Sequence, residues 1–275
     1  MKETELQTVV DIPVSAWKIK PCARLLFVGS CFAANMGERF REDGFRVTVN
    51  PYGVMYNPVS VRHTIERLVQ TTTDDTSYAA AVLTLGTNHI YILNETGEVV
   101  DNCEKRPQRL FTEQTLNVTQ VGEELCAAIR LLRQHCPDIH VILTVSPIRY
   151  RKYGFHESQL SKATLLLGAD EVVRKMEGVS YFPAYELIND ELRDYRFYAP
   201  DMLHPSQQAV DYIGRRFGET YFAAETVDFL KAWQPLRAAL AHRPLHPESE
   251  EYRQFKEKTL AQVEELRKKY PEFSF

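Results

Sequence analysis

Short apolar runs alternate with helix-like segments along the first half of this 275-residue chain. The runs suited to buried strands lie at residues 25–28, 46–49, 81–85 and 140–145. Residues 58–70 and 119–135 carry apolar side chains at helical spacing. Alternating strands and helices predict a mainly parallel sheet with helices on both faces and right-handed crossovers. We therefore expect a three-layer α/β/α sandwich, with function at the carboxyl ends of the strands.

The first apolar run leads into a turn where a nucleophile would be exposed. Residues 25–33 read as a strand, a turn led by Gly29, and the start of a helix that continues to residue 40. The side chains after Gly29 are expected at the carboxyl edge of the sheet. The free N–H groups and the positive dipole end of the helix favour an anion there. Ser30 and Cys31 occupy this position.

A second segment, residues 201–206, supplies a candidate base. Asp201 precedes His204 by three residues, so one loop or helical turn can carry both. An unperturbed imidazole titrates near neutral pH, which suits a general base that later acts as an acid. Asp201 would fix the tautomer of His204 and stabilise the imidazolium. Such a pair also arises as a capping Asp and a surface His, so the prediction depends on both segments together.

Five short sequence motifs are spread along the chain. Residues 29–33 spell Gly-Ser-Cys-Phe-Ala, and the others lie at residues 50–58, 84–87, 145–149 and 190–198. In these motifs the chain resembles the GSCFA family along most of its length. That family looks related to the SGNH (GDSL-like) hydrolases, which are esterases, lipases and acyl-transferring enzymes. The resemblance implies an SGNH-type, flavodoxin-like α/β/α fold.

The resemblance leaves two candidate nucleophiles. In the GDSL-like pattern, a Gly is followed by any residue and then by the nucleophilic Ser, and that register places Cys31 at the attacking position. A thiolate beside a His at a helix N-terminus would favour a thioester intermediate, and acyl transfer as readily as hydrolysis. In the alternative, Ser30 attacks and Cys31 faces the core as a small apolar residue. In a third interpretation, neither residue reacts.

The resemblance also implies an oxyanion hole. Relatives use the N–H of the nucleophile, a Gly N–H after the second strand, and an Asn side chain from a G-x-N-D block. Here Gly53 lies in the turn after the second strand, and Gly86 and Asn88 follow the third. Each such donor can stabilise a transition state by about 3 kcal/mol. Alternatively, Asn88 is a turn residue that satisfies its own backbone, and Gly53 serves a turn with positive φ.

The function we expect is a hydrolase or acyltransferase that acts on an ester or thioester through a covalent acyl-enzyme. Arg149, after the strand at 140–145, could hold an anionic part of the substrate, and Tyr198 could form part of an apolar or sugar-stacking wall. Both also fit a solvated loop and core packing. Carbohydrate O-acyl groups are candidate substrates by analogy with relatives. The competing interpretation is an inactive SGNH-like module that binds a small molecule or a carbohydrate.

Composition narrows the range of partners. The net charge of −4 gives no basic footprint for nucleic acid or an anionic membrane. Residues 1–7 lack an apolar run, and no stretch is long enough to span a bilayer, so we expect a cytoplasmic protein. The cysteines are odd in number, without C-x-x-C spacing, which argues against disulfides and zinc: Cys22, Cys31, Cys103, Cys126 and Cys136. We expect no metal, because no two His or Cys residues have ligand spacing on one helix. We also expect no nucleotide cofactor, because G-x-G-x-x-G is absent from the first turn.

The C-terminal part differs in character from the rest. We predict an SGNH-like domain at residues 1–230 and a helical extension packed on it at residues 231–275. Residues 72–77 read as a polar loop, and residues 233–247 as loop with a short helix. A charged amphipathic helix follows to residue 270, with four apolar residues expected to face inward: Phe255, Leu260, Val263 and Leu266. Such a helix also suits a partner-binding role.

Overall fold

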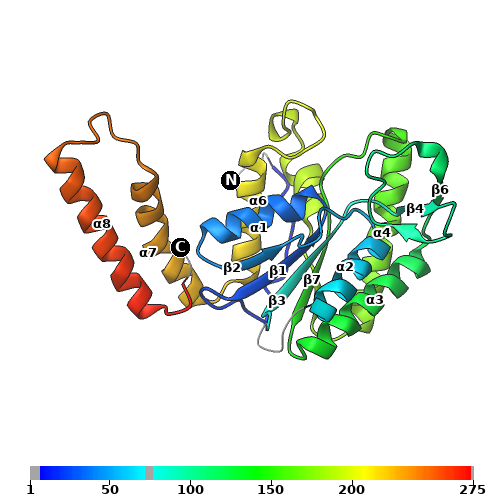
Figure 1. Ribbon diagram of the computed structural model, residues 1–275, viewed down its shortest axis with the longest axis horizontal. Coiled ribbons are helices and arrows are strands. Elements are labelled where there is room, and N and C mark those ends of the chain that lie inside the picture. The colour runs from blue at the N-terminus through cyan, green and yellow to red at the C-terminus, as the bar shows by residue number, and fades with distance from the viewer. Residues whose placement is uncertain (1–6, 72–76, 274–275) are drawn as a thin grey trace, which may run out of the picture.

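The computed structural model describes residues 7–71 and 77–273 (Figure 1). The polar loop predicted at 72–77 lies mostly outside this part, as do residues 1–6. Five strands form a parallel sheet in the order β2-β1-β3-β7-β8. They are β1 (Arg24–Gly29), β2 (Arg46–Val49), β3 (Ala80–Leu85), β7 (His140–Val145) and β8 (Val179–Tyr181). The predicted parallel α/β fold is confirmed, and β8 is an additional short edge strand.

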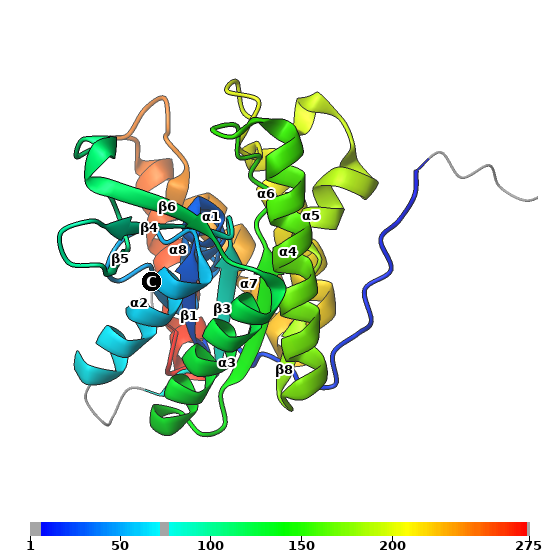
Figure 2. The same ribbon diagram turned by 90° about the vertical axis from the view of Figure 1, so that its right-hand side faces the viewer.

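Helices cover both faces of the sheet. On one face lie α2 (Pro58–Thr71), α3 (Val118–His135) and α4 (Gly154–Lys175), side by side in front of the sheet in Figure 2. The other face is covered by α1 (Cys31–Glu42), α5 (Ala184–Glu186) and α6 (Gln207–Tyr221). Successive side chains of β1 alternate between the two cores, with Phe27 packing among α1 and α6 and Val28 on the side of α2 and α3. Because both faces are covered, the central strands β3 and β7 are buried along their whole length and are mostly apolar.

A second, antiparallel sheet interrupts the alternation after β3. Its strands are β4 (His89–Leu93), β5 (Val99–Val100) and β6 (Phe111–Thr115), in the order β5-β4-β6. It lies beyond the carboxyl end of β3, close to the upper ends of α2 and α3 in Figure 2. The sequence analysis did not predict these strands: β5 has two residues and β6 is mostly polar, and the short apolar run of β4 at residues 90–93 was not recognised as a strand.

The C-terminal segment forms two antiparallel helices that project from the sheet domain (Figure 1). They are α7 (Ala224–Ala241) and α8 (Glu250–Lys269). The prediction of a loop with a short helix at 233–247 was wrong in its first half, because α7 continues through Pro235 to Ala241. The carbonyl of Lys231, which Pro235 leaves without an N–H donor, belongs to an exposed residue and can be hydrated. The division at residue 231 stays a prediction.

Only the C-terminal half of α8 faces the core as expected. Val263 and Leu266 are buried, and they join the aromatic cluster around Phe229. Phe255 and Leu260 were predicted to face inward, but they are 42% and 43% exposed. The N-terminal half of α8 lies at the far end of the projecting pair, away from the sheet domain (Figure 1), so it has less surface to pack against.

Candidate active site

The turn between β1 and α1 is fixed by a close approach of two strands. Gly29 has a φ of +137°, and a Cβ at this position would collide with the carbonyl oxygen of Thr84 in β3. Its N–H donates to Oδ1 of Asn50 at 2.8 Å. These constraints set the backbone of the next two residues, Ser30 and Cys31, at the carboxyl edge of the sheet.

Ser30 and Cys31 differ sharply in environment. Ser30 is the N-cap of α1: its Oγ accepts from the N–H of Phe32 at 3.2 Å and lies 3.1 Å from Oγ1 of Thr84. The whole residue is 1% exposed. Cys31 is the first residue of α1 and is half-buried, and its Sγ lies 3.7 Å from the hydroxyl of Tyr56. The Ser30 hydroxyl is therefore used to hold the turn, whereas the thiol of Cys31 is open to a cavity.

His204 and Asp201 form a pair in the loop before α6. Oδ2 of Asp201 lies 2.5 Å from Nδ1 of His204, and Oδ1 accepts from the N–H groups of Leu203 and His204 at 2.9 and 3.0 Å. The N–H groups of His204 and Leu203, followed by the imidazole, lower the pKa of Asp201 to about 2. The carboxylate is thus charged at neutral pH. A carboxylate beside Nδ1 favours the imidazole tautomer with its proton on Nδ1, which leaves Nε2 as the proton acceptor.

One cavity of about 340 Å³ brings the predicted nucleophile and base together. Its lining consists of Ser30, Cys31, Tyr56, Gly86, Ser146, Ile148, Arg149, Tyr150, Arg151, Lys152, Leu203 and His204. Within residues 7–71 and 77–273, no hydrogen bond joins Cys31 to His204. Catalytic hydrogen bonds are often long before substrate binds. The carboxyl ends of β1, β3 and β7 therefore meet at this cavity, as expected for a parallel sheet.

The three predicted oxyanion donors do not assemble at Cys31. Gly53, with a φ of +98°, donates its N–H to the carbonyl of Asn50 and lines a different cavity. Gly86 does line the Cys31 cavity, but its N–H donates to the carbonyl of Tyr56 at 2.8 Å. Asn88 is buried, and its Nδ2 donates to the carbonyl of Leu116 at 2.7 Å. Each of the three groups thus donates to an oxygen atom of the chain, and neither Gly53 nor Asn88 lines the Cys31 cavity.

Arg149 borders the cavity, and Tyr198 lies behind it. The N–H of Arg149 donates to the carbonyl of Leu203 at 3.0 Å, and its Nη1 donates to the carbonyl of Met202 at 3.3 Å. Its guanidinium lies 5.6 Å from the ring centroid of Tyr198. Arg149 thus joins the loop after β7 to the loop that carries His204. Tyr198 packs on Arg149 and does not itself line the cavity.

Family models match nearly all of the described chain. The GSCFA family model matches residues 24–81 and 75–217, and the model named GSCFA domain protein, C-terminal domain, matches residues 233–275. The chain belongs to the GSCFA family. The resemblance inferred from the five motifs is thereby confirmed. No curated protein sequence matches this GSCFA protein.

Solved structures similar to this GSCFA protein are GDSL-like lipases and esterases. A putative GDSL-like lipase from Parabacteroides merdae is 11% identical, with a TM-score of 0.50, over 76% of this chain and 98% of that one. A member of the lipolytic G-D-S-L family from Veillonella parvula is 14% identical, with a TM-score of 0.47, over 72% and 97% of the two chains. At this identity the likeness shows a hydrolase-like fold alone.

A buried lysine behind the cavity of the GSCFA protein was not anticipated. Lys162 in α4 is 2% exposed, and its Nζ donates to the carbonyls of Gly86 and Ser146, both at 2.7 Å. Burial lowers the pKa of Lys162 to about 7. Helical spacing offered a signal, since Lys162 lies on the same face of α4 as the buried Leu165 and Ala169. The lysine links the ends of β3 and β7 beneath the site.

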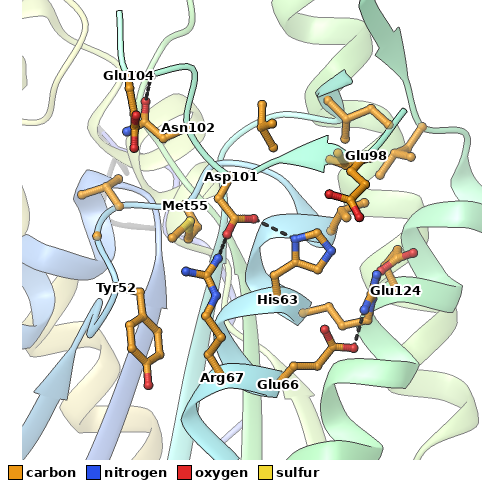
Figure 3. Close-up of a pocket in the computed structure, with 18 of the residues that line it drawn as sticks. Tyr52, Met55, His63, Glu66, Arg67, Glu98, Asp101, Asn102, Glu104 and Glu124 are labelled. Atoms are coloured by element: carbon orange, nitrogen blue, oxygen red, sulfur yellow. Dashed lines mark hydrogen bonds and ion pairs between the residues drawn. The ribbon is translucent and has the colours of Figure 1, made fainter. Parts of the chain in front are cut away.

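A larger cavity, of about 880 Å³, lies between α2 and the second sheet and holds another His–Asp pair (Figure 3). Nδ1 of His63 lies 2.8 Å from Oδ1 of Asp101, and Arg67 pairs with the same carboxylate. Burial, with the charge of Arg62, lowers the pKa of His63. The described residues that line this cavity include no Ser, Thr or Cys. Among these two cavities, the one at Cys31 is lined by the candidate nucleophiles Ser30 and Cys31.

The described residues can be compared with the patterns of metal sites, disulfides and membrane-spanning helices. In the part of the chain that the structure describes, no three His, Cys, Asp or Glu side chains cluster as metal ligands would. All five cysteines are free thiols. None of the described helices is long and apolar enough to cross a bilayer.

Proposed function

We propose that this GSCFA protein is a hydrolase or acyltransferase that forms an acyl-enzyme on Cys31 from an ester or thioester. The observation that carries the proposal is the contrast at the β1–α1 turn. Ser30 and Cys31 both line the cavity that holds His204, but the buried Ser30 hydroxyl caps the helix, whereas the Cys31 thiol is half-exposed and His204 pairs with Asp201. The GDSL-like fold supports an acyl-transfer reaction without specifying it.

The reaction proceeds in two halves. In the first, Nε2 of His204 takes the thiol proton of Cys31, and the thiolate attacks the carbonyl carbon of the substrate. The C–S bond forms, the C=O electron pair moves onto oxygen, and collapse of the intermediate expels the leaving group, which receives the proton from His204. In the second half, water or another nucleophile gives its proton to His204 and attacks the thioester. Collapse of this second intermediate breaks the C–S bond, and the leaving thiolate of Cys31 takes the proton from His204, so the acyl group is released and the thiol is restored.

The size and the charge of the cavity indicate which substrates would fit it. Its volume of about 340 Å³ suits a small acyl group with part of its leaving group, rather than a long lipid. Three basic residues line it, Arg149, Arg151 and Lys152, and these would favour a substrate with an anionic portion. Small esters and thioesters with a nearby carboxylate or phosphate, and O-acetylated sugars, are the first substrates to assay.

Intact-mass spectrometry after exposure to p-nitrophenyl acetate and to a short-chain acyl thioester tests the proposal. The wild type should gain a single acyl group, which Cys31→Ala removes and His204→Ala slows by at least 100-fold. Cys126→Ser is the matched control, because Cys126 is a free, half-buried thiol outside this cavity. Labelling that ignores His204, or no acylation by any probe, would favour the binding-module interpretation.

A further inference from the structure

The acyl-enzyme proposed above requires hydrogen-bond donors that the expected residues do not provide. Attack on a carbonyl places negative charge on its oxygen, and donors aimed at that oxygen supply much of the catalysis in such enzymes. Cys31 is the first residue of α1, where helix geometry leaves N–H groups without intrahelical acceptors, so its own N–H is one donor. The Gly86 N–H is bonded to Tyr56, and Asn88, whose amide donates to Leu116, does not line the Cys31 cavity, which leaves the side-chain donor to be identified.

The hydroxyl of Tyr56 meets the requirements of that donor. It lies 3.7 Å from Sγ of Cys31 and lines the same cavity as His204. The developing oxyanion is attached to the carbon that bonds to Sγ, so a hydroxyl beside Sγ is within reach of that oxygen. Partial burial, followed by the hydrogen bond with Cys31, raises the pKa of Tyr56 to about 12. The hydroxyl therefore keeps its proton at neutral pH and can donate it in a hydrogen bond.

The backbone of Tyr56 is held against the end of β3. Its carbonyl accepts from the N–H groups of Gly86 and Thr87 at 2.8 and 2.9 Å. The approach is close, since a Cβ on Gly86 would lie 3.0 Å from that carbonyl oxygen. The carbonyl of Gly86 in turn accepts from Nζ of Lys162. A continuous chain of contacts thus runs from the buried lysine through the Gly86 turn to Tyr56 and Cys31.

We propose that Tyr56 donates its phenolic hydrogen bond to the oxyanion formed on Cys31, in the place where related hydrolases use an asparagine side chain, and that Lys162 is a positioning residue acting through the Gly86 turn. The proposal rests on the acyl-enzyme function above. No proton is transferred by Tyr56. As the C–S bond forms, its hydroxyl turns from Sγ to the negatively charged oxygen, where the hydrogen bond is stronger.

Two reactions of Cys31 separate this role from a general effect on the thiol. Acylation by p-nitrophenyl acetate forms an oxyanion, whereas alkylation by iodoacetamide does not. Tyr56→Phe should slow acylation about 100-fold and leave alkylation within about threefold of the wild type. Tyr52→Phe is the matched control, because Tyr52 lies in the same loop between β2 and α2 as Tyr56. Its hydroxyl is hydrogen-bonded to Oγ1 of Thr71 and lies outside the Cys31 cavity. Tyr52→Phe should change neither rate.

Lys162 is tested by a double-mutant cycle. Lys162→Met should slow acylation about 10-fold without slowing alkylation equally, and the double variant with Tyr56→Phe should be no slower than Tyr56→Phe alone, because both act through one contact chain. Additive losses would overturn the positioning role. Acylation of Tyr56→Phe at the wild-type rate, or an equal loss of both reactions, would overturn the oxyanion role. Wild-type Cys31 that is alkylated but never acylated would instead overturn the proposed function, and the oxyanion role with it.

Discussion

Ser30 and Thr84 are hydrogen-bonded to each other across β1 and β3. The Ser30 N–H donates to Oγ1 of Thr84 at 2.9 Å, and the two hydroxyl oxygens lie 3.1 Å apart in a buried setting. The same Ser30 oxygen caps α1. These bonds fix the serine within the framework and place the next residue, Cys31, at the cavity.

Ser30→Ala should therefore act on stability rather than on chemistry. Loss of the N-cap is expected to lower the free energy of unfolding by about 1 kcal/mol, as for other helix caps. Urea denaturation measures this effect, and the rate of Cys31 acylation should stay within about threefold of the wild type. If the variant is as stable as the wild type but cannot be acylated, Ser30 is the nucleophile.

Asp201→Asn should impair acylation while leaving the fold intact. The amide can present its N–H₂ to Nδ1 of His204 and so favour the wrong tautomer, and a loss of roughly 10²–10⁴-fold is expected. Because the pKa of Asp201 is about 2, its carboxylate is charged throughout pH 4 to 9. The wild-type acylation rate should therefore show no inflection caused by Asp201 between pH 4 and 9. Near pH 9, the ratio of the wild-type rate to the Asp201→Asn rate should not change with pH. Equal rates for the two proteins would remove Asp201 from the mechanism.

Because of Lys162, the free energy of unfolding should increase as pH rises above neutrality. Its pKa in the folded state, about 7, lies below the usual 10.5, so between these values the unfolded chain binds more protons. Stability of the wild type should rise by about 2 kcal/mol from pH 7 to 9 relative to Lys162→Met. Urea denaturation at several pH values measures this difference. Parallel pH curves for the two proteins would show that the lysine keeps its ordinary pKa.

His140 should destabilise the fold in acid. It stacks on Trp17 with ring centroids 4.3 Å apart, and Nε2 lies 2.9 Å from Oγ of Ser180. Burial, aided by the charge of Arg133, lowers its pKa from 6.5 to about 4. The unfolded chain therefore binds more protons between these values, and up to about 3 kcal/mol of stability is lost as pH falls from 6.5 to 4.

The replacement His140→Gln tests this acid effect. Between pH 4 and 6.5, the free energy of unfolding of this variant should depend much less on pH than that of the wild type. His246→Gln is the matched control, because His246 is exposed, and it should keep the wild-type pH dependence. An unchanged slope in His140→Gln would contradict the assignment.

Much of the fold could be predicted because it rests on burial. The strands β1, β3 and β7 are covered on both faces, so each leaves a continuous apolar run in the sequence. The second sheet is partly exposed: β6 is mostly polar, and β4 has only a short apolar run at residues 90–93, which was not recognised. Residues 233–247 were predicted as loop with a short helix, but α7 continues through Pro235, where the proline costs the helix one hydrogen bond at the exposed residue Lys231.

The candidate site could be predicted where it depends on spacing along the chain. Cys31 follows a strand end, and Asp201 lies three residues from His204, so both were found by motif. The role of Asn88 as a donor depends instead on which acceptors lie nearby in space, and its amide is bonded to Leu116. Lys162 was missed because a lysine is expected at the surface, whereas here two carbonyls from different strands satisfy it.

The most direct test of the central claim is to map the acyl group after acid quenching of the wild-type protein during its reaction with p-nitrophenyl acetate. Tandem mass spectrometry of the peptide that contains both Ser30 and Cys31 identifies the modified residue. The structure predicts an acetyl group on Cys31, bound as a thioester that neutral hydroxylamine removes. An acetyl group on Ser30 that resists neutral hydroxylamine, or an unmodified peptide while product accumulates, would contradict the account.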